Sequence, residues 1–176
     1  MASENNLKEE LKKAKKLHNK GVDGDKKAVQ KAKDELLTLR QIEPNNALIE
    51  AYYGSSLALL ARDAVRLLDK EEKAQEGLDS LNRAVSMDPN QKEIRLLRAN
   101  VCLRLPEEYF SCSKIAIEDF TFLLNGYQRD SNYLSKDLVI DILKKLSKAY
   151  KNDGKPDEAA AVLDRLTKIK EKRKNK

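Results

Sequence analysis

The sequence predicts an all-α fold, a solenoid of about four antiparallel helix pairs that forms a single domain over residues 1–176. Apolar residues recur at spacings of three and four along nearly the whole chain, and no stretch alternates apolar and polar residues as a strand would. Gly, Pro, Asn and Asp separate these stripes at short intervals. Two segments ending in Pro-Asn, at Pro44 and Pro89, lie 45 residues apart, which indicates an internal repeat.

The first four predicted helices follow from apolar stripes and the breakers between them. The stripes are Leu7, Leu11, Ala14 and Leu17; Val29, Ala32, Leu36 and Leu39; Ala51, Gly54, Leu57 and Leu68; and Ala74, Leu78, Leu81 and Ala84. A glycine-containing turn at 21–24 ends the first, and Pro44 ends the second because the residue before a proline disfavours helix. No breaker precedes Asp69, so we expect one elongated helix near 47–70 that projects from the stack.

Four more helices are predicted in the second half of the chain. Their stripes are Ile94, Leu97 and Val101; Ala116, Phe120 and Leu123; Val139, Leu143, Leu146 and Tyr150; and Ala159, Leu163, Leu166 and Ile169. Residues 126–134 are expected to form a connection, and Pro156 suits the first position of the last helix. Residues 170–176 are expected to form a disordered basic tail.

Charge and hydropathy narrow the class of protein. The net charge of +6 comes from the two ends, since residues 1–31 carry +4 and residues 164–176 carry +5, while the segment between them carries −3. Only 5% of residues are aromatic, so few could stack on bases, and nucleic-acid binding is disfavoured. No apolar run is long enough to span a membrane. Charges interrupt residues 1–17 where a signal peptide needs an apolar stretch, so we expect a cytoplasmic protein.

No residue pattern indicates catalysis or a cofactor. Cys102 and Cys112 are expected to be small buried thiols and not a disulfide, because cytosolic cysteines stay reduced. His18 is the one histidine, which argues against a zinc site, and we expect it to act as a cation at the end of its helix. Glycine-rich phosphate loops and nucleophile motifs are missing. The sequence therefore predicts no enzyme, no metal and no cofactor.

The last helix pair resembles the tetratricopeptide repeat (TPR) family. It carries Leu146 and Tyr150 on the first helix, Gly154 in the turn and the small Ala159 on the second helix. The segment 74–89 is similar to a second helix of that family, including its terminal proline. The resemblance covers most of residues 25–170 and implies a right-handed superhelix, in which each pair buries one face on the next.

The spacing departs from the family's period of about 34 residues. About eleven extra residues lie between Gly54 and Gly77, which we assign to the elongated helix, and about five precede Phe120, which we assign to an extra turn near 105–110. Tyr52 and Tyr53 are adjacent, so we expect one to face the core and the other to pack on a neighbouring helix or anchor a peptide. Arg62 and Asp63 are expected to form an exposed charge pair.

The resemblance implies that the first helix of each pair lines a hollow, partner-binding side. Using the small residue of each helix as register, we expect an apolar groove with polar groups that becomes basic at one end. The candidate partner-binding residues are Leu48, Ser55, Leu96, Asn100, Leu103, Lys144, Lys148 and Lys151. The fold and these residues predict a non-enzymatic scaffold or adaptor that binds a peptide or partner protein.

Some members of this family hold the carboxylate of an acidic C-terminal peptide. Asn100, Lys144 and Lys148 fall where their clamp has Asn and two cations, although Lys replaces Arg at one position and forfeits its bidentate fork. Ala51 and Ser55 do not match the remaining Lys and Asn. The sequence therefore leaves two interpretations of the lysines, a partial clamp and an ordinary solvated helix face.

Two alternatives stay open. The Lys-rich segments 8–20 and 168–176 could bind nucleic acid or an anionic surface, in which case affinity would fall steeply with salt. The chain could also be an assembly subunit, including a homo-oligomer, whose groove is filled by its own first helix. That arrangement would bury Leu48 and Leu96 beneath residues 7–17.

Overall fold

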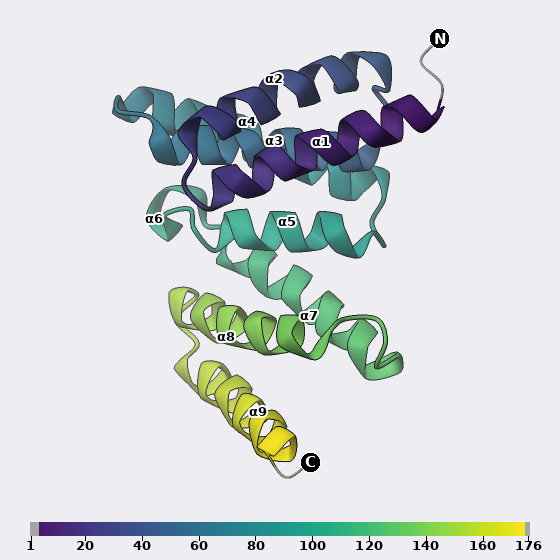
Figure 1. The fold of residues 1–176 in the computed structure, drawn as a ribbon. Coiled ribbons are helices and arrows are strands. Elements are labelled where there is room, and N and C mark those ends of the chain that lie inside the picture. The colour runs from purple at the N-terminus through teal and green to yellow at the C-terminus, as the bar shows by residue number, and fades with distance from the viewer. Residues whose placement is uncertain (1–3, 175–176) are drawn as a thin grey trace. The chain divides into compact units, whose positions relative to one another are not determined.

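The computed structural model describes residues 4–174, and in that range all regular secondary structure is helical, which confirms the all-α prediction (Figure 1). The helices, in chain order, are α1 (Glu4–Val22), α2 (Lys26–Ile42), α3 (Ala47–Asp63), α4 (Leu67–Met87), α5 (Lys92–Cys102), α6 (Glu107–Phe110), α7 (Ser113–Arg129), α8 (Lys136–Asn152) and α9 (Pro156–Lys174). Short turns join helices that run in opposite directions, as in α1 and α2.

The chain divides into two compact units, with the boundary between Arg98 and Ala99. The sequence, by contrast, predicts a single domain. The core of the first unit gathers apolar residues of α1, α2 and α3: Ala14, Ala32, Leu36, Leu39, Ile49, Tyr52, Tyr53 and Leu57. The second unit buries the matching stripes of α7, α8 and α9, with Phe120, Leu143 and Ala159 among its fully buried side chains. Most residues of the predicted stripes are thus buried on the helical period, whereas Leu68 and Leu163 are exposed.

The prediction of one elongated helix near 47–70 was wrong. α3 ends at Asp63, and Ala64 and Arg66 take extended backbone angles that reverse the chain, so the extra residues lengthen the start of α4 instead. No Gly or Pro marks this reversal. It forms because an antiparallel α4 buries Leu78 and Leu81 against α3, a gain that outweighs local helix propensity. Val65 at the tip is 95% exposed.

Two glycines allow α3 and α4 to approach closely. A Cβ on Gly54 would lie 2.6 Å from the carbonyl oxygen of Gly77, and a Cβ on Gly77 would lie 2.7 Å from the carbonyl oxygen of Gly54. Because both obstacles are backbone atoms, neither helix can accept a side chain there without moving apart. Gly54 and Gly77 are therefore reciprocal points of close approach between the two helices.

The remaining helix boundaries differ modestly from expectation. The extra turn expected near 105–110 is the one-turn helix α6. α7 continues through Gly126 to Arg129, so the connection begins later than predicted, and the ring of Tyr133 covers Gly126. α9 runs to Lys174, through most of the segment expected to be a disordered tail. Residues 175–176 lie outside the described residues.

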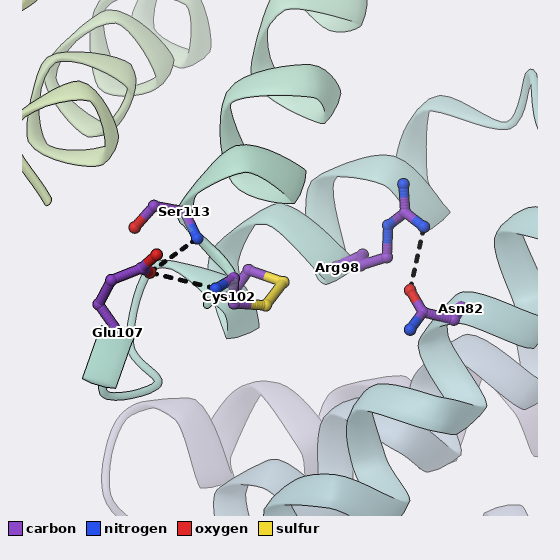
Figure 2. The surroundings of a disulfide bond; sticks show 6 residues. Asn82, Arg98, Cys102, Glu107 and Ser113 are labelled. Carbon is purple, nitrogen blue, oxygen red and sulfur yellow. Dashed lines mark hydrogen bonds between the residues drawn. A yellow bond between two sulfur atoms is a disulfide. The ribbon is translucent and has the colours of Figure 1, made fainter. Parts of the chain in front are cut away.

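Cys102 and Cys112 form a disulfide, so the prediction of two free thiols was wrong (Figure 2). The chain reverses through α6 and brings the two Cα atoms to 5.1 Å, within the range that a disulfide spans. Sequence spacing alone did not show this reversal. Disulfides persist in oxidising surroundings, so the bond counts against the reducing cytoplasm from which free thiols were inferred.

None of the helices within residues 4–174 has the length and apolar character that crossing a lipid bilayer requires.

Candidate functional site

Helix α1 covers part of the face of α3 that was predicted to line an open groove. Ser55 is 5% exposed, and its Oγ lies 2.8 Å from Nε2 of His18, at hydrogen-bonding distance. The prediction that Ser55 faces a partner therefore needs correction, because the side chain is occupied within the first unit. His18 is 2% exposed and α1 continues past it to Val22, so the residue does not lie at the end of its helix as expected.

The same face carries a polar network that joins three helices of the first unit. Tyr52 of α3 donates a hydrogen bond of 2.6 Å to Oε1 of Glu93, which also accepts one of 2.9 Å from Lys15 of α1. The Lys15 ammonium lies 5.0 Å from the centre of the Tyr52 ring. Burial, and then Glu93, raise the pKa of Tyr52 well above its ordinary value. These contacts fix α1 against α3 and α5.

Both adjacent tyrosines are buried, which differs from the expectation that only one faces the core. Tyr53 points to the opposite side of α3, where its hydroxyl donates to Glu76 of α4 at 3.2 Å and its ring lies under Arg40 of α2. Burial, followed by Glu76, raises the pKa of Tyr53. α3 has partners on both sides, so two neighbouring positions can pack at once.

The other predicted groove residues differ in accessibility. Leu48 and Leu96 are half-buried, and Leu48 packs against the first unit's core. Leu103 follows the end of α5 and is 7% exposed, so its place on an accessible wall is not supported. Asn100 is half-buried, and its Oδ1 has no hydrogen-bond partner among the described residues.

The three predicted lysines lie on one exposed face of α8, which we call the lysine ridge. Lys144, Lys148 and Lys151 follow one another at helical spacings of four and three, and all three are exposed. The apolar face of α8, with Leu143 and Leu146, is turned into the core of the second unit. The sequence thus placed the ridge on the surface correctly, and its role in binding stays a prediction.

The basic character of α1 is partly neutralised by ion pairs. Lys12 lies 3.8 Å from Glu9, Lys13 lies 2.7 Å from Glu10, and Lys15 is held by Glu93. These pairs reduce the positive field that the segment 8–20 could offer to a nucleic acid or an anionic surface.

Arg62 serves a structural role that the sequence did not indicate. Its Nη2 donates to the carbonyl oxygen of Gly21 at 3.0 Å, and its Nε donates to Asp63 at 2.8 Å. The guanidinium therefore adds a second donor to the Gly21 carbonyl oxygen, which also accepts from the backbone N–H of Gly24, in the last turn of α1, where a cation is favoured. The Arg62–Asp63 pair forms as predicted but is more than a solvent-exposed contact.

Sequence reasoning missed a charged pocket in the first unit. Glu50, 2% exposed, accepts a hydrogen bond of 2.5 Å from Nε of Arg40 and one of 2.9 Å from Nε of Arg83. A pocket of about 270 Å³ opens beside this triad, with Leu37 and Pro44 among its walls. The one available signal was an acidic residue inside the apolar run that begins α3. Among the described residues, no cluster of His, Cys, Asp and Glu could hold a metal ion.

Comparison with known proteins supports the fold alone. Two solved structures of MamA superpose on this chain, the first with a TM-score of 0.64 and 18% sequence identity over 99% of this chain and 84% of MamA. The second gives a TM-score of 0.60 and 17% identity over 97% of this chain and 80% of the other. No family model matches, and no curated protein matches by sequence. The helical-repeat architecture is therefore shown, whereas membership of the TPR family rests on the resemblance.

Proposed function

We propose that this protein is a non-enzymatic interaction scaffold. The lysine ridge of α8 binds an acidic segment of the partner protein. The observation that carries the proposal is the ridge itself, three exposed cations on one helix face at 144, 148 and 151. No ion pair joins any of the three to the residues described. By contrast, the neighbouring Lys145 is paired with Asp141 at 2.7 Å.

A helical-repeat fold supports this function on physical grounds. Stacked helix pairs bury their own cores and leave long exposed helix faces that other chains can contact. Among the residues that the structure describes, no group of His, Cys, Asp and Glu could hold a metal ion. An acidic peptide would gain charge-assisted contacts to the ridge and faster association, since complementary charge steers the encounter. A free C-terminal carboxylate on the partner, which belongs to one of the two interpretations that the sequence leaves open, is part of this proposal.

A fluorescent acidic hexapeptide of Asp and Glu, titrated against the full chain, tests the proposal. We expect saturable binding that the matched Asn/Gln peptide lacks, and a loss of about tenfold or more in affinity for the double variant Lys144→Glu, Lys148→Glu. The control variant Lys27→Glu, Lys31→Glu changes two exposed lysines of α2 at the same spacing and should bind like the unmodified chain.

Two outcomes would contradict the proposal. Equal affinity of the α8 and α2 variants would show that the ridge is only a solvated surface. Tighter binding of duplex DNA than of the peptide, unchanged in the α8 variant, would favour the alternative of a nucleic-acid binder acting through the segments 8–20 and 168–176.

A further inference from the structure

We propose that the pocket between α2, α3 and α4 is a carboxylate-binding site, built from Arg40 and Arg83 and held in shape by the buried Glu50. It lies wholly within the first unit and is distinct from the lysine ridge. The proposal rests on the proposed function only in assigning the carboxylate to a partner protein.

The geometry begins with the burial of Glu50. Its side chain is 2% exposed, and a carboxylate buried this deeply requires charged or hydrogen-bonding partners to offset desolvation. Arg40 donates to Oε2, and Arg83 donates to Oε1 through both Nε and Nη2. The carboxylate thus uses both oxygens and holds two guanidinium groups that would otherwise repel each other.

Other contacts fix the orientation of each guanidinium. The Arg40 guanidinium lies 4.9 Å from the centre of the Tyr53 ring, a cation–π contact, and Tyr53 is itself anchored to Glu76. Arg83 Nη2 also lies within 3.3 Å of Ser80 Oγ. A ligand would therefore meet donors that are already positioned, which lowers the entropy that binding must offset.

Donors remain available on both arginines. Within the described part of the chain, no group accepts a hydrogen bond from either terminal nitrogen of Arg40 or from Nη1 of Arg83. The Arg83 side chain is half exposed and the Arg40 side chain about one-third exposed, so solvent reaches both. Both residues line the pocket, where their free N–H groups suit the two oxygens of a carboxylate.

Charge and shape favour a carboxylate over a phosphate. Two guanidinium groups and one carboxylate leave a net charge of +1, which a monoanion neutralises and a dianion exceeds. Leu37 and Pro44 supply apolar wall beside the charged groups, so the matching ligand carries aliphatic carbons next to its carboxylate. Peptide chains offer this combination at a C-terminus with an apolar last residue and in the side chain of Glu.

The test uses small probes on the full chain and follows the side-chain Nε–H signals of Arg40 and Arg83 by NMR. N-acetyl-leucine represents a terminal carboxylate and N-acetyl-glutamic α-amide a side-chain carboxylate. We expect saturable shifts of both arginine signals with at least one of these probes, and the tighter probe identifies the source. N-acetyl-leucinamide, which lacks the carboxylate, should produce no saturable shift. Inorganic phosphate should bind more weakly.

Variants separate the pocket from the structural triad. Arg83→Gln should abolish binding, but it also leaves Glu50 with one fewer partner and can lower stability. Gln41→Glu leaves the triad intact and adds a negative charge at the pocket wall, so it should weaken binding by about tenfold or more. Gln128→Glu makes the same change at an exposed position of α7, in the second unit, and should have no effect.

The proposal is overturned if neither carboxylate probe shifts the arginine signals, if the amide or phosphate binds as tightly, or if Gln41→Glu binds like Gln128→Glu. The double variant Lys144→Glu, Lys148→Glu should leave probe binding intact. With that result, the proposal of a carboxylate-binding pocket would hold even if the lysine ridge does not bind the acidic peptide.

Discussion

Individual residues show how strongly backbone proximity constrains this fold. Gly54 and Gly77 face each other's carbonyl oxygens, whereas the atoms nearest to an added Cβ on Gly126 belong to the ring of Tyr133. Backbone atoms cannot rotate away from an added methyl group, but a tyrosine ring can. Substitution by alanine should therefore cost more stability at Gly54 than at Gly126, although both residues lie in helices.

Gly54→Ala should lower the free energy of unfolding by about 1–3 kcal/mol, since overpacking forces α3 and α4 apart. Gly126→Ala should change it by less than about 1 kcal/mol, because Tyr133 can shift and alanine is the better helix former. Urea denaturation followed by circular dichroism measures both. A Gly54→Ala variant as stable as the unmodified chain would contradict the close approach of the two helices.

Tyr52 links stability to alkaline pH. Its folded-state pKa is raised by burial and Glu93 above the unfolded value of 10.0. Between these values the unfolded chain loses a proton that the folded chain keeps, so stability falls as pH rises above about 10. The stabilisation from Tyr52 is complete below that pH.

Tyr52→Phe should cost about 1 kcal/mol near pH 8 through loss of the hydrogen bond to Glu93. The difference from the unmodified chain should shrink above pH 10, because phenylalanine does not titrate. Tyr109→Phe, at a 73% exposed position, is the control for removing a tyrosine hydroxyl outside this network. A Tyr52→Phe difference that stays constant from pH 8 to 11 would be incompatible with a raised pKa.

At the scale of elements, the ends of helices depend on contacts distant in sequence. Arg62, at the end of α3, donates to the carbonyl oxygens of Gly21 and Val22 at the end of α1. The Gly21 carbonyl oxygen also accepts from the backbone N–H of Gly24, so Arg62 adds to the hydrogen bonds that close this turn. One side chain thus secures the meeting point of two helices from different pairs.

Arg62→Ala should destabilise the first unit by about 1 kcal/mol and speed hydrogen exchange in the last turn of α1. Arg66→Ala is the matched control, because Arg66 is largely exposed and lies 3.9 Å from Asp69, a surface pair of little energetic value. Equal effects of the two substitutions would remove the capping role of Arg62.

The sequence predicted the elements better than their ends. Apolar stripes located all eight expected helices, and Pro44, Pro89 and Gly154 marked turns correctly. The chain reversal at Ala64–Arg66 could not be predicted, because no local residue pattern requires it. The packing of α4 on α3 imposes it. The burial of Ser55 could not be predicted for the same reason, since its partner His18 is 37 residues away in the sequence.

The candidate sites show the same division. The exposed lysine ridge follows from helical spacing on a single helix, so it could be predicted. The pocket around Glu50 joins α2, α3 and α4, and no periodicity reveals that Arg40 and Arg83 converge on one carboxylate. Sites that need several helices are visible only once the helices are packed.

At the scale of the whole molecule, the chain consists of two units, and only the second contains the disulfide. A cross-link restricts the unfolded chain, which stabilises the folded state by typically about 2–4 kcal/mol. The bond between Cys102 and Cys112 should therefore support residues 99–174 in particular. Glu107, whose carboxylate accepts hydrogen bonds from the backbone N–H of Cys112 and Ser113, orders the same hairpin (Figure 2).

Cys102→Ser combined with Cys112→Ser should speed hydrogen exchange in α7 and α8 while leaving the protection of α3 unchanged. Mass spectrometry should show no alkylation of either cysteine when the unmodified chain is treated without prior reduction. After reduction, both cysteines should be alkylated. Faster exchange in α3 to the same extent as in α8 would indicate that the two units unfold as one.

The Cys102–Cys112 bond makes the shape of one hairpin depend on where the polypeptide is made. Glutathione and thioredoxin keep such pairs open inside most cells, whereas secretory environments close them. A bacterial strain with an ordinary cytoplasm and one engineered to be oxidising would thus yield two chemically distinct preparations from a single gene. In the open form, Glu107 would still accept hydrogen bonds from the backbone N–H groups of Cys112 and Ser113 at the start of α7.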